Sequence, residues 1–151
     1  MTNLMEMKMH QWIIALKALF LGLMLSTASV HASEPVKVVY HMSEGIPQAS
    51  RGLNNIRNHL AADPSAKIVV VTHGLGIDFL LQGATNQMEQ PFAGAISDLA
   101  NRGVEFRVCN NTLTSRKLEA TKLVMEAKLV PSGVAEVATM QAKQGYVYLR
   151  P

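Results

Sequence analysis

The clearest structural signal of the chain lies in the stretch Lys67-Ile68-Val69-Val70-Val71-Thr72-His73-Gly74. Its near-continuous run of β-branched residues is typical of a strand that is covered on both faces of a sheet. Val36–Tyr40 shows the same pattern earlier in the chain, and between the two Pro47–Leu60 repeats apolar residues at helical spacing. Because two such strands are separated by a helix, we expect them to pair in parallel.

The segments that follow continue this alternation of helix and strand. We expect a helical turn over Ile77–Leu81, and then a helix over Phe92–Ala100 that stops at Gly103. A third strand is predicted over Val104–Val108. Together these elements indicate an α/β fold.

The C-terminal third completes the pattern. The spacing of Ala120, Leu123, Val124 and Ala127 predicts a helix, and Leu129–Val130 predicts a brief strand. A last helix over Ser132–Gln144, with Val134, Val137 and Ala138 facing inward, precedes a closing strand over Tyr146–Leu149. The expected architecture is a small α/β sandwich with a mostly parallel sheet of about five strands.

Residues 1–32 have the pattern of a cleaved signal peptide. Lys8 and His10 precede the apolar stretch Ala18–Leu25, and Val30-His31-Ala32 resembles a cleavage site. The apolar stretch is too short to span a bilayer stably. An uncleaved amphipathic anchor is the alternative. We therefore expect a periplasmic or secreted protein whose single mature domain covers residues 33–151.

The charge of the expected mature domain argues against nucleic acid as a partner. It keeps twelve basic and ten acidic residues, because Lys8, Lys17 and Glu6 are the charged residues before position 33. The basic residues are scattered, and no basic stripe with interleaved aromatic residues occurs.

The topology predicts where a functional site lies. Parallel strands bring their carboxyl ends to one edge of the sheet, and ligands of open α/β sheets bind there. The first three strands end at His41, His73 and Cys109. Asn110-Asn111-Thr112 offers a helix start immediately after Cys109, and the N–H groups of such a start stabilise a thiolate.

Cys109 is the single cysteine of the chain, which is unusual for an exported protein. Structural interpretations exist for each strand-end residue. A free cysteine packs well as a small buried hydrophobe, and His41 and His73 can serve as hydrogen-bonding residues of their loops.

A cofactor is not expected. Gly74-Leu75-Gly76 follows the second strand, as in a dinucleotide-binding turn. Phe79, however, occupies the position of the third glycine, and no acidic residue stands at the end of a following strand. The glycines are better explained by a tight turn of the backbone at the strand end.

Three segments of the chain form a recognisable combination. They are Val71–Gly74 with Ile77–Leu81, Leu99–Leu113, and Val130–Glu136 continued by Gly145–Pro151. The most specific part combines a Gly-Val strand that ends in cysteine with a Val-Pro-x-Gly-Val-Ala-Glu tail. These segments resemble the DsrE/DsrF-like superfamily, in its small single-domain, YchN-like branch, and the resemblance covers essentially the whole expected mature chain.

This resemblance implies a flavodoxin-like fold, a trimer or hexamer, and in the sulfur-relay members a cysteine that carries sulfur as a persulfide. Cys109 maps onto that cysteine. Arg116 resembles a basic residue that often follows it and is expected to support the thiolate electrostatically, although Lys117 stands where a glycine is common. The relay members work in the cytoplasm, whereas the leader pattern predicts export, which favours a periplasmic role in handling reduced or zero-valent sulfur.

Three hypotheses follow. In the leading one, Cys109 accepts sulfur, supported by His41, His73, Asn110 and Arg116, and exchanges it with a donor or acceptor protein. In the second, His41, His73 and Cys109 bind a metal such as Zn or Cu. In the third, the protein is a non-catalytic oligomer whose thiol is buried or forms an intersubunit disulfide.

Overall fold

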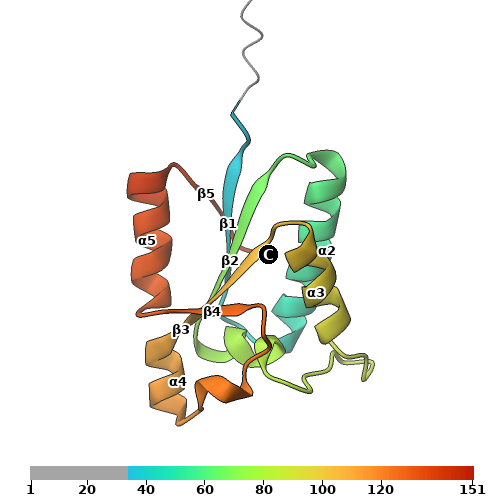
Figure 1. Cartoon of the computed structure of the whole chain (residues 1–151), viewed down its shortest axis with the longest axis vertical. Coiled ribbons are helices and arrows are strands. Elements are labelled where there is room, and N and C mark those ends of the chain that lie inside the picture. The colour runs from blue at the N-terminus through green and yellow to red at the C-terminus, as the bar shows by residue number, and fades with distance from the viewer. Residues whose placement is uncertain (1–33) are drawn as a thin grey trace, which may run out of the picture. The chain divides into compact units, whose positions relative to one another are not determined.

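The computed structural model describes residues 34–151, of which Pro35–Pro151 form one compact unit. The expected signal peptide at residues 1–32 lies outside the described part. Five strands form one sheet in the order β4-β3-β2-β1-β5, and every neighbouring pair is parallel (Figure 1). The strands are β1 (Lys37–Met42), β2 (Lys67–Thr72), β3 (Glu105–Cys109), β4 (Ala127–Val130) and β5 (Val147–Leu149).

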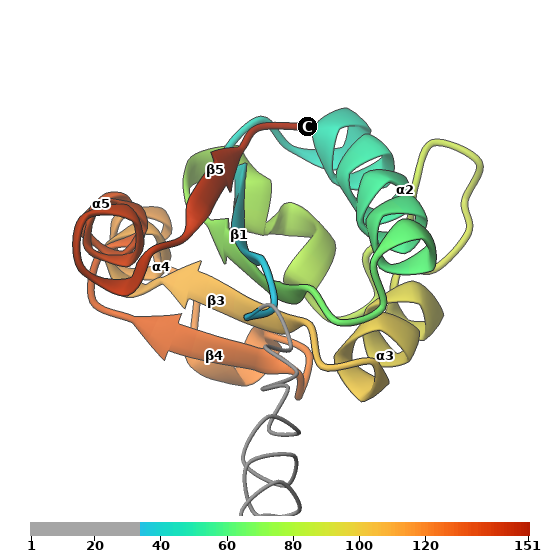
Figure 2. The same cartoon turned by 90° about the horizontal axis from the view of Figure 1, so that it is seen from above.

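Helices cover both faces of the sheet, which confirms the expected α/β sandwich. Figure 2 shows α2 and α3 on one side of the strands and α5 on the other. The α-helices are α2 (Ile46–Ala62), α3 (Ala93–Asn101), α4 (Asn110–Arg116) and α5 (Gly133–Gln144), and the 3-10 helices are η1 (Gly74–Leu80) and η2 (Ala120–Lys122).

The two faces of the sheet bury two separate hydrophobic clusters, because side chains alternate along each strand. Val38, Tyr40 and Met42 of β1 belong to the larger cluster, which includes buried residues of α2 and α3. Val39 lies in the smaller one, with valines of β2 and with Val137 and Met140 of α5. In this alternation, residues 39, 41, 71, 107 and 109 point toward the α5 face.

The predicted helix through Ala120 and Ala127 is wrong. Helix α4 ends early because Lys117 adopts a left-handed conformation, with φ of 54°, and Leu118 N–H closes back on the Leu113 carbonyl at 2.9 Å. Leu123 is buried through an antiparallel bridge to Leu81, and β4 begins at Ala127. The apolar residues there belong to three different features: the 3-10 helix η2, the bridge at Leu123 and the start of β4.

The predicted inward face of the last helix is also wrong in part. Val137 is buried as expected, but Val134 is 64% exposed and Ala138 is exposed. The helix buries Gly133, Val137 and Met140 instead. The buried stripe starts at a glycine, which a search for apolar side chains passes over.

The described residues contain no helix with the length and apolarity needed to cross a membrane.

The turn after β2 requires glycine twice, as the sequence indicated. Gly74 has a φ of +57°, and a Cβ at Gly76 would lie 2.1 Å from the Met42 carbonyl oxygen. This close approach joins the start of η1 to the end of β1.

We predict that Gly76→Ala lowers the free energy of unfolding by about 3 kcal/mol, because the backbone around Met42 must move to admit the methyl group. Gly94→Ala is the control, since a Cβ there meets nothing within 4 Å. In helix α3 it is expected to stabilise the protein by up to about 1 kcal/mol. Urea unfolding of both variants measures the difference, and equal midpoints would contradict the role of this contact.

Candidate functional site

The carboxyl edge of the sheet brings together the strand-end residues that the sequence indicated. His41 lies near the end of β1, His73 directly follows β2, and Cys109 ends β3. The β2–β3 register pairs Thr72 with Val108, so the next residues, His73 and Cys109, follow side by side. Both therefore stand on the α5 face, where one helix covers them.

The Cys109 thiol is nearly buried, and hydrogen-bond donors of two neighbouring helix starts lower its pKa. The residue is 5% exposed and is the N-cap of α4. Burial raises the pKa of Cys109, but hydrogen bonds to the sulfur outweigh it and hold the pKa below its ordinary value of 9.0. The donors are the Gly133 N–H, the Thr112 hydroxyl, and the N–H groups of Thr112 and Asn111.

These donors come from two helix starts that meet at one sulfur atom. Asn111 and Thr112 belong to the first turn of α4, and Gly133 is the first residue of α5. The first N–H groups of a helix have no partner within the helix and favour negative charge. The thiolate is thus stabilised by N–H groups that have no partner within their own helix, although the Asn111 N–H also donates to the Pro131 carbonyl at 3.3 Å.

Thr112 is oriented to donate to the sulfur. The Gly74 N–H donates to the Thr112 hydroxyl oxygen at 3.0 Å, which leaves the hydroxyl proton available for Cys109. Thr112 is 8% exposed and is held between the turn after β2 and the thiol. The sequence indicated the helix start at this position, but not this donor, because its orientation depends on Gly74.

Gly133 permits the close approach of α5 to the thiol. A Cβ at this position would lie 3.2 Å from the Cys109 Cβ, 3.2 Å from the Thr72 carbonyl oxygen and 3.3 Å from the His73 Cβ. Such contacts are too tight without a shift of the neighbours. Glycine therefore lets the first N–H of α5 approach the Cys109 sulfur. The Cβ atoms of His73 and Cys109 lie on either side of the same point.

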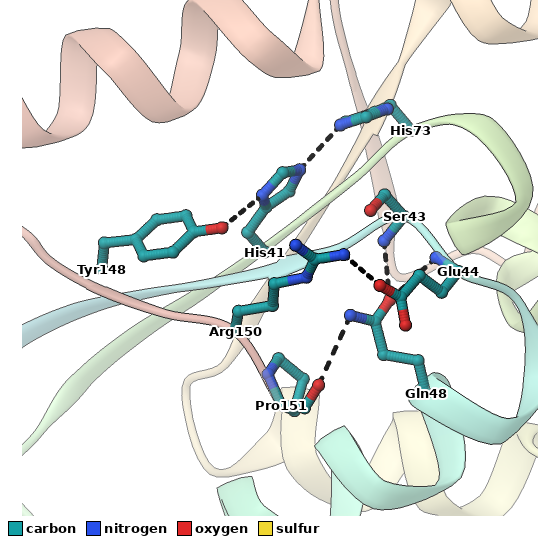
Figure 3. Close-up of polar contacts among 8 residues, drawn as sticks. All are labelled: His41, Ser43, Glu44, Gln48, His73, Tyr148, Arg150 and Pro151. Carbon is teal, nitrogen blue, oxygen red and sulfur yellow. Dashed lines mark hydrogen bonds and ion pairs between the residues drawn. The ribbon is translucent and has the colours of Figure 1, made fainter.

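The two histidines contact one another. Their Nε2 atoms are 2.7 Å apart, and the Tyr148 hydroxyl lies 2.9 Å from the His41 Nδ1 (Figure 3). Burial lowers the pKa of His41, and the neighbouring His73 and Arg150 lower it further. Tyr148 was not a candidate from the sequence, because local pattern does not show that β5 pairs with β1.

Arg116 and Asn110, the other expected supporting residues, lie in α4. The Arg116 guanidinium forms an ion pair with Asp78 at 2.6 Å and donates to the Gly74 carbonyl at 3.0 Å. It thereby fixes the turn that positions Thr112, and the direct electrostatic support of the thiolate stays a prediction. Asn110 is exposed on the first turn of the helix.

Polar contacts hold the C-terminal segment across the same edge (Figure 3). Arg150 forms an ion pair with Glu44, and the buried Gln48 side chain donates to the Pro151 carbonyl at 3.5 Å. The side-chain oxygen of Gln48, Oε1, accepts hydrogen bonds from the backbone N–H groups of Ser43 and Glu44. These contacts keep β5, and with it Tyr148, beside His41.

The metal hypothesis receives no geometric support from residues 34–151, where no group of three or more His, Cys, Asp or Glu side chains is arranged to hold a metal ion. His41 and His73 bond to each other instead of facing a common vacant point.

We predict that Thr112→Val raises the pKa of the Cys109 thiol, because the variant keeps the shape of the side chain and loses its hydroxyl donor. A loss of about 1 kcal/mol corresponds to a shift of somewhat less than one pH unit. The pH dependence of alkylation by iodoacetamide measures it. Thr112→Ser should restore the wild-type profile, and an unchanged profile in Thr112→Val would remove the hydroxyl from the site.

Solved structures of other proteins share this fold. The MTH1491 protein of unknown function from Methanobacterium thermoautotrophicum superimposes with a TM-score of 0.67 and 28% identity, over 77% of this chain and 99% of that one. The ychN protein from E. coli shares the fold, with a TM-score of 0.62 and 11% identity over 79% of this chain and 100% of that one.

Sequence comparison extends the likeness. A UPF0597 protein from Shewanella pealeana is 26% identical over 142 residues, which are 94% of this chain and 31% of that protein. The chain thus spans about a third of that relative's length. The model of the DsrE/DsrF-like family matches residues 18–151, which confirms the resemblance seen in the sequence. The chain belongs to the DsrE/DsrF-like family.

Proposed function

We propose that this protein carries sulfur as a persulfide on Cys109. Membership of a family of the sulfur-relay type supports this function. The observation that carries the proposal is the set of donors around a nearly buried sulfur: three backbone N–H groups and one hydroxyl, which lower the pKa of the thiol against the effect of burial. A structural cysteine in a hydrophobic core needs no such donors.

The chemistry is thiol–disulfide exchange. The Cys109 thiolate attacks the sulfane sulfur of a polysulfide, a new S–S bond forms to Cys109, and the old S–S bond breaks. The electron pair of the broken bond leaves with the shortened polysulfide anion, so no external oxidant or reductant is required. When the persulfide passes its outer sulfur to an acceptor thiolate, the same donors stabilise the Cys109 thiolate as the leaving group.

The surroundings of the thiol suit a donor or acceptor protein as partner. Leu75 and Val134 are 58% and 64% exposed, and each follows a glycine that contacts the site. Exposed apolar side chains next to a reactive group are typical of contact surfaces. Because Cys109 is only 5% exposed, we expect a partner protein to reach the sulfur by engaging this surface.

Two further expectations belong to the proposal. The first is self-association as a trimer or hexamer, supported by the exposed apolar residues Leu129, Val147 and Leu149 on the two edge strands β4 and β5. The second is a periplasmic or secreted location, which rests on the signal-peptide pattern of residues 1–32 alone.

We expect incubation of the reduced protein with inorganic polysulfide to add the mass of one sulfur atom to Cys109, because a lowered pKa increases the fraction of nucleophilic thiolate. Intact mass spectrometry measures the gain, and dithiothreitol should reverse it. Cys109→Ala is a clean control, since it removes the single cysteine of the chain.

Absence of a sulfur adduct, together with slow alkylation of the native thiol, would refute the persulfide function. Such a result would favour the hypothesis of a buried structural thiol. A disulfide-linked dimer on non-reducing electrophoresis of the native protein would instead favour the intersubunit disulfide.

A further inference from the structure

A cavity of about 490 Å³ lies between α2, the start of α3 and the loop that joins η1 to α3. Figure 2 shows this loop arching beside α2, on the face of the sheet that α5 does not cover. The volume is within the range of small-molecule binding sites. Cys109 belongs to the α5 face, so the cavity is separate from the sulfur site.

Helix α2 supplies one wall of the cavity because four of its lining residues share a face. Ser50, Leu53, Asn54 and Arg57 follow one another at the spacing of successive helical turns. Leu53 is buried in the larger hydrophobic cluster, Arg57 is half-buried and Asn54 is exposed. The wall therefore changes from apolar at the core to polar and basic toward solvent.

The loop between η1 and α3 supplies another wall and is held by its own hydrogen bonds. Thr85 and Pro91 form an antiparallel bridge. Between them, the Asn86 Oδ1 accepts from the N–H groups of Met88 and Gln90 at 2.8 and 3.0 Å. The Asn86 Nδ2 donates to the Gln90 Oε1 at 3.0 Å. Because the asparagine satisfies the backbone of its turn, this wall is formed before a ligand arrives.

Arg57 gives the cavity its charge. Among the described residues that line it, Arg57 alone is charged, and no carboxylate belongs to its walls. The guanidinium forms no ion pair within residues 34–151, where its Nη1 donates to the Asn54 Oδ1 at 2.9 Å. A guanidinium has five N–H donors, so this neutral partner leaves most of them, and the charge, for an anion.

The apolar part of the cavity suits a ligand with a hydrophobic body. Leu53 and Phe92 are 2% and 5% exposed, and Ala95 in the first turn of α3 is half-buried beside them in the lining. Met88 lines the cavity from the loop and is 74% exposed. Its flexible thioether side chain adapts to the shape of a ligand, and covering it removes apolar surface from water.

We propose that this cavity binds a small organic anion, a carboxylate or sulfonate with an apolar body next to the charged group. Arg57 pairs with the anionic group, since a planar guanidinium fits two oxygens of such a group at once. Leu53, Phe92 and Met88 contact the apolar body. The site uses no residue around Cys109 and stands independently of the persulfide function.

Two fluorescent probes that share one ring system test this site. Anilinonaphthalene sulfonate carries one negative charge, and phenylnaphthylamine is the same compound without the sulfonate. Fluorescence titration of the native protein gives the Kd of each. We expect Arg57→Gln to weaken binding of the sulfonate probe about tenfold and to leave the neutral probe unchanged, because only the charge is lost. Met88→Gln should weaken both probes about threefold, because apolar contact is lost.

Arg51→Gln and Met125→Gln are matched controls. Arg51 is exposed on α2, Met125 is 96% exposed, and neither lines the cavity, so both variants should bind the probes like the wild type. Absence of sulfonate-probe binding by the wild type would overturn the proposal. Equal sulfonate-probe affinity in Arg57→Gln and Arg51→Gln would also overturn it, because the probe would then bind exposed apolar surface only. Sulfur loading of Cys109 is measured separately by mass, so failure of one proposal is distinguished from failure of the other.

Discussion

The close approach of α5 to the end of β3 determines the chemistry available to Cys109. Gly133 has no side chain to hold the helix away, so the first N–H of α5 reaches the sulfur. Two residues before Cys109, Arg107 forms ion pairs with Glu136 of α5 and with Glu105 of its own strand. The ion pair between Arg107 and Glu136 thus holds α5 against β3, close to Gly133, whose N–H donates to the thiol. Val137 and Met140 add a small hydrophobic cluster with β1 and β2.

Two opposing effects set the reactivity of the thiol. Burial disfavours the thiolate and raises the pKa of Cys109, whereas four donors favour the thiolate and lower it below 9.0. The proposed sulfur exchange depends on such a balance, because a thiol whose pKa falls too far becomes a weak nucleophile, while one whose pKa is high is mostly protonated. Deep burial without donors would raise the pKa of the thiol. Donors at an exposed sulfur would lower that pKa with no opposing effect of burial.

Much of the fold and part of the site could be predicted from the sequence. Strands alternate their side chains with a period of two, so His41, His73 and Cys109 at parallel strand ends had to approach one edge. The donors could not be predicted in the same way. Thr112 and Gly133 act through orientation and through an absent side chain, and both depend on segments distant in the chain. The stripe from Ala120 to Ala127 predicted a helix because residues of a 3-10 turn, an isolated bridge and a strand coincide with helical spacing.

Strand β5, which carries Tyr148, is held differently from the rest of the sheet. β5 pairs with β1 over three residues, and Val147, Tyr148 and Leu149 are all exposed, so burial contributes little to its position. Polar contacts of Arg150 with Glu44 and of Pro151 with Gln48 hold it instead. Segments with few buried apolar contacts open locally at lower free energy than the core strands. Opening of β5 would separate Tyr148 from His41 while the donors around Cys109, which come from α4 and α5, stay in place. The donors to Cys109 and the contact between Tyr148 and His41 are therefore held by different parts of the fold.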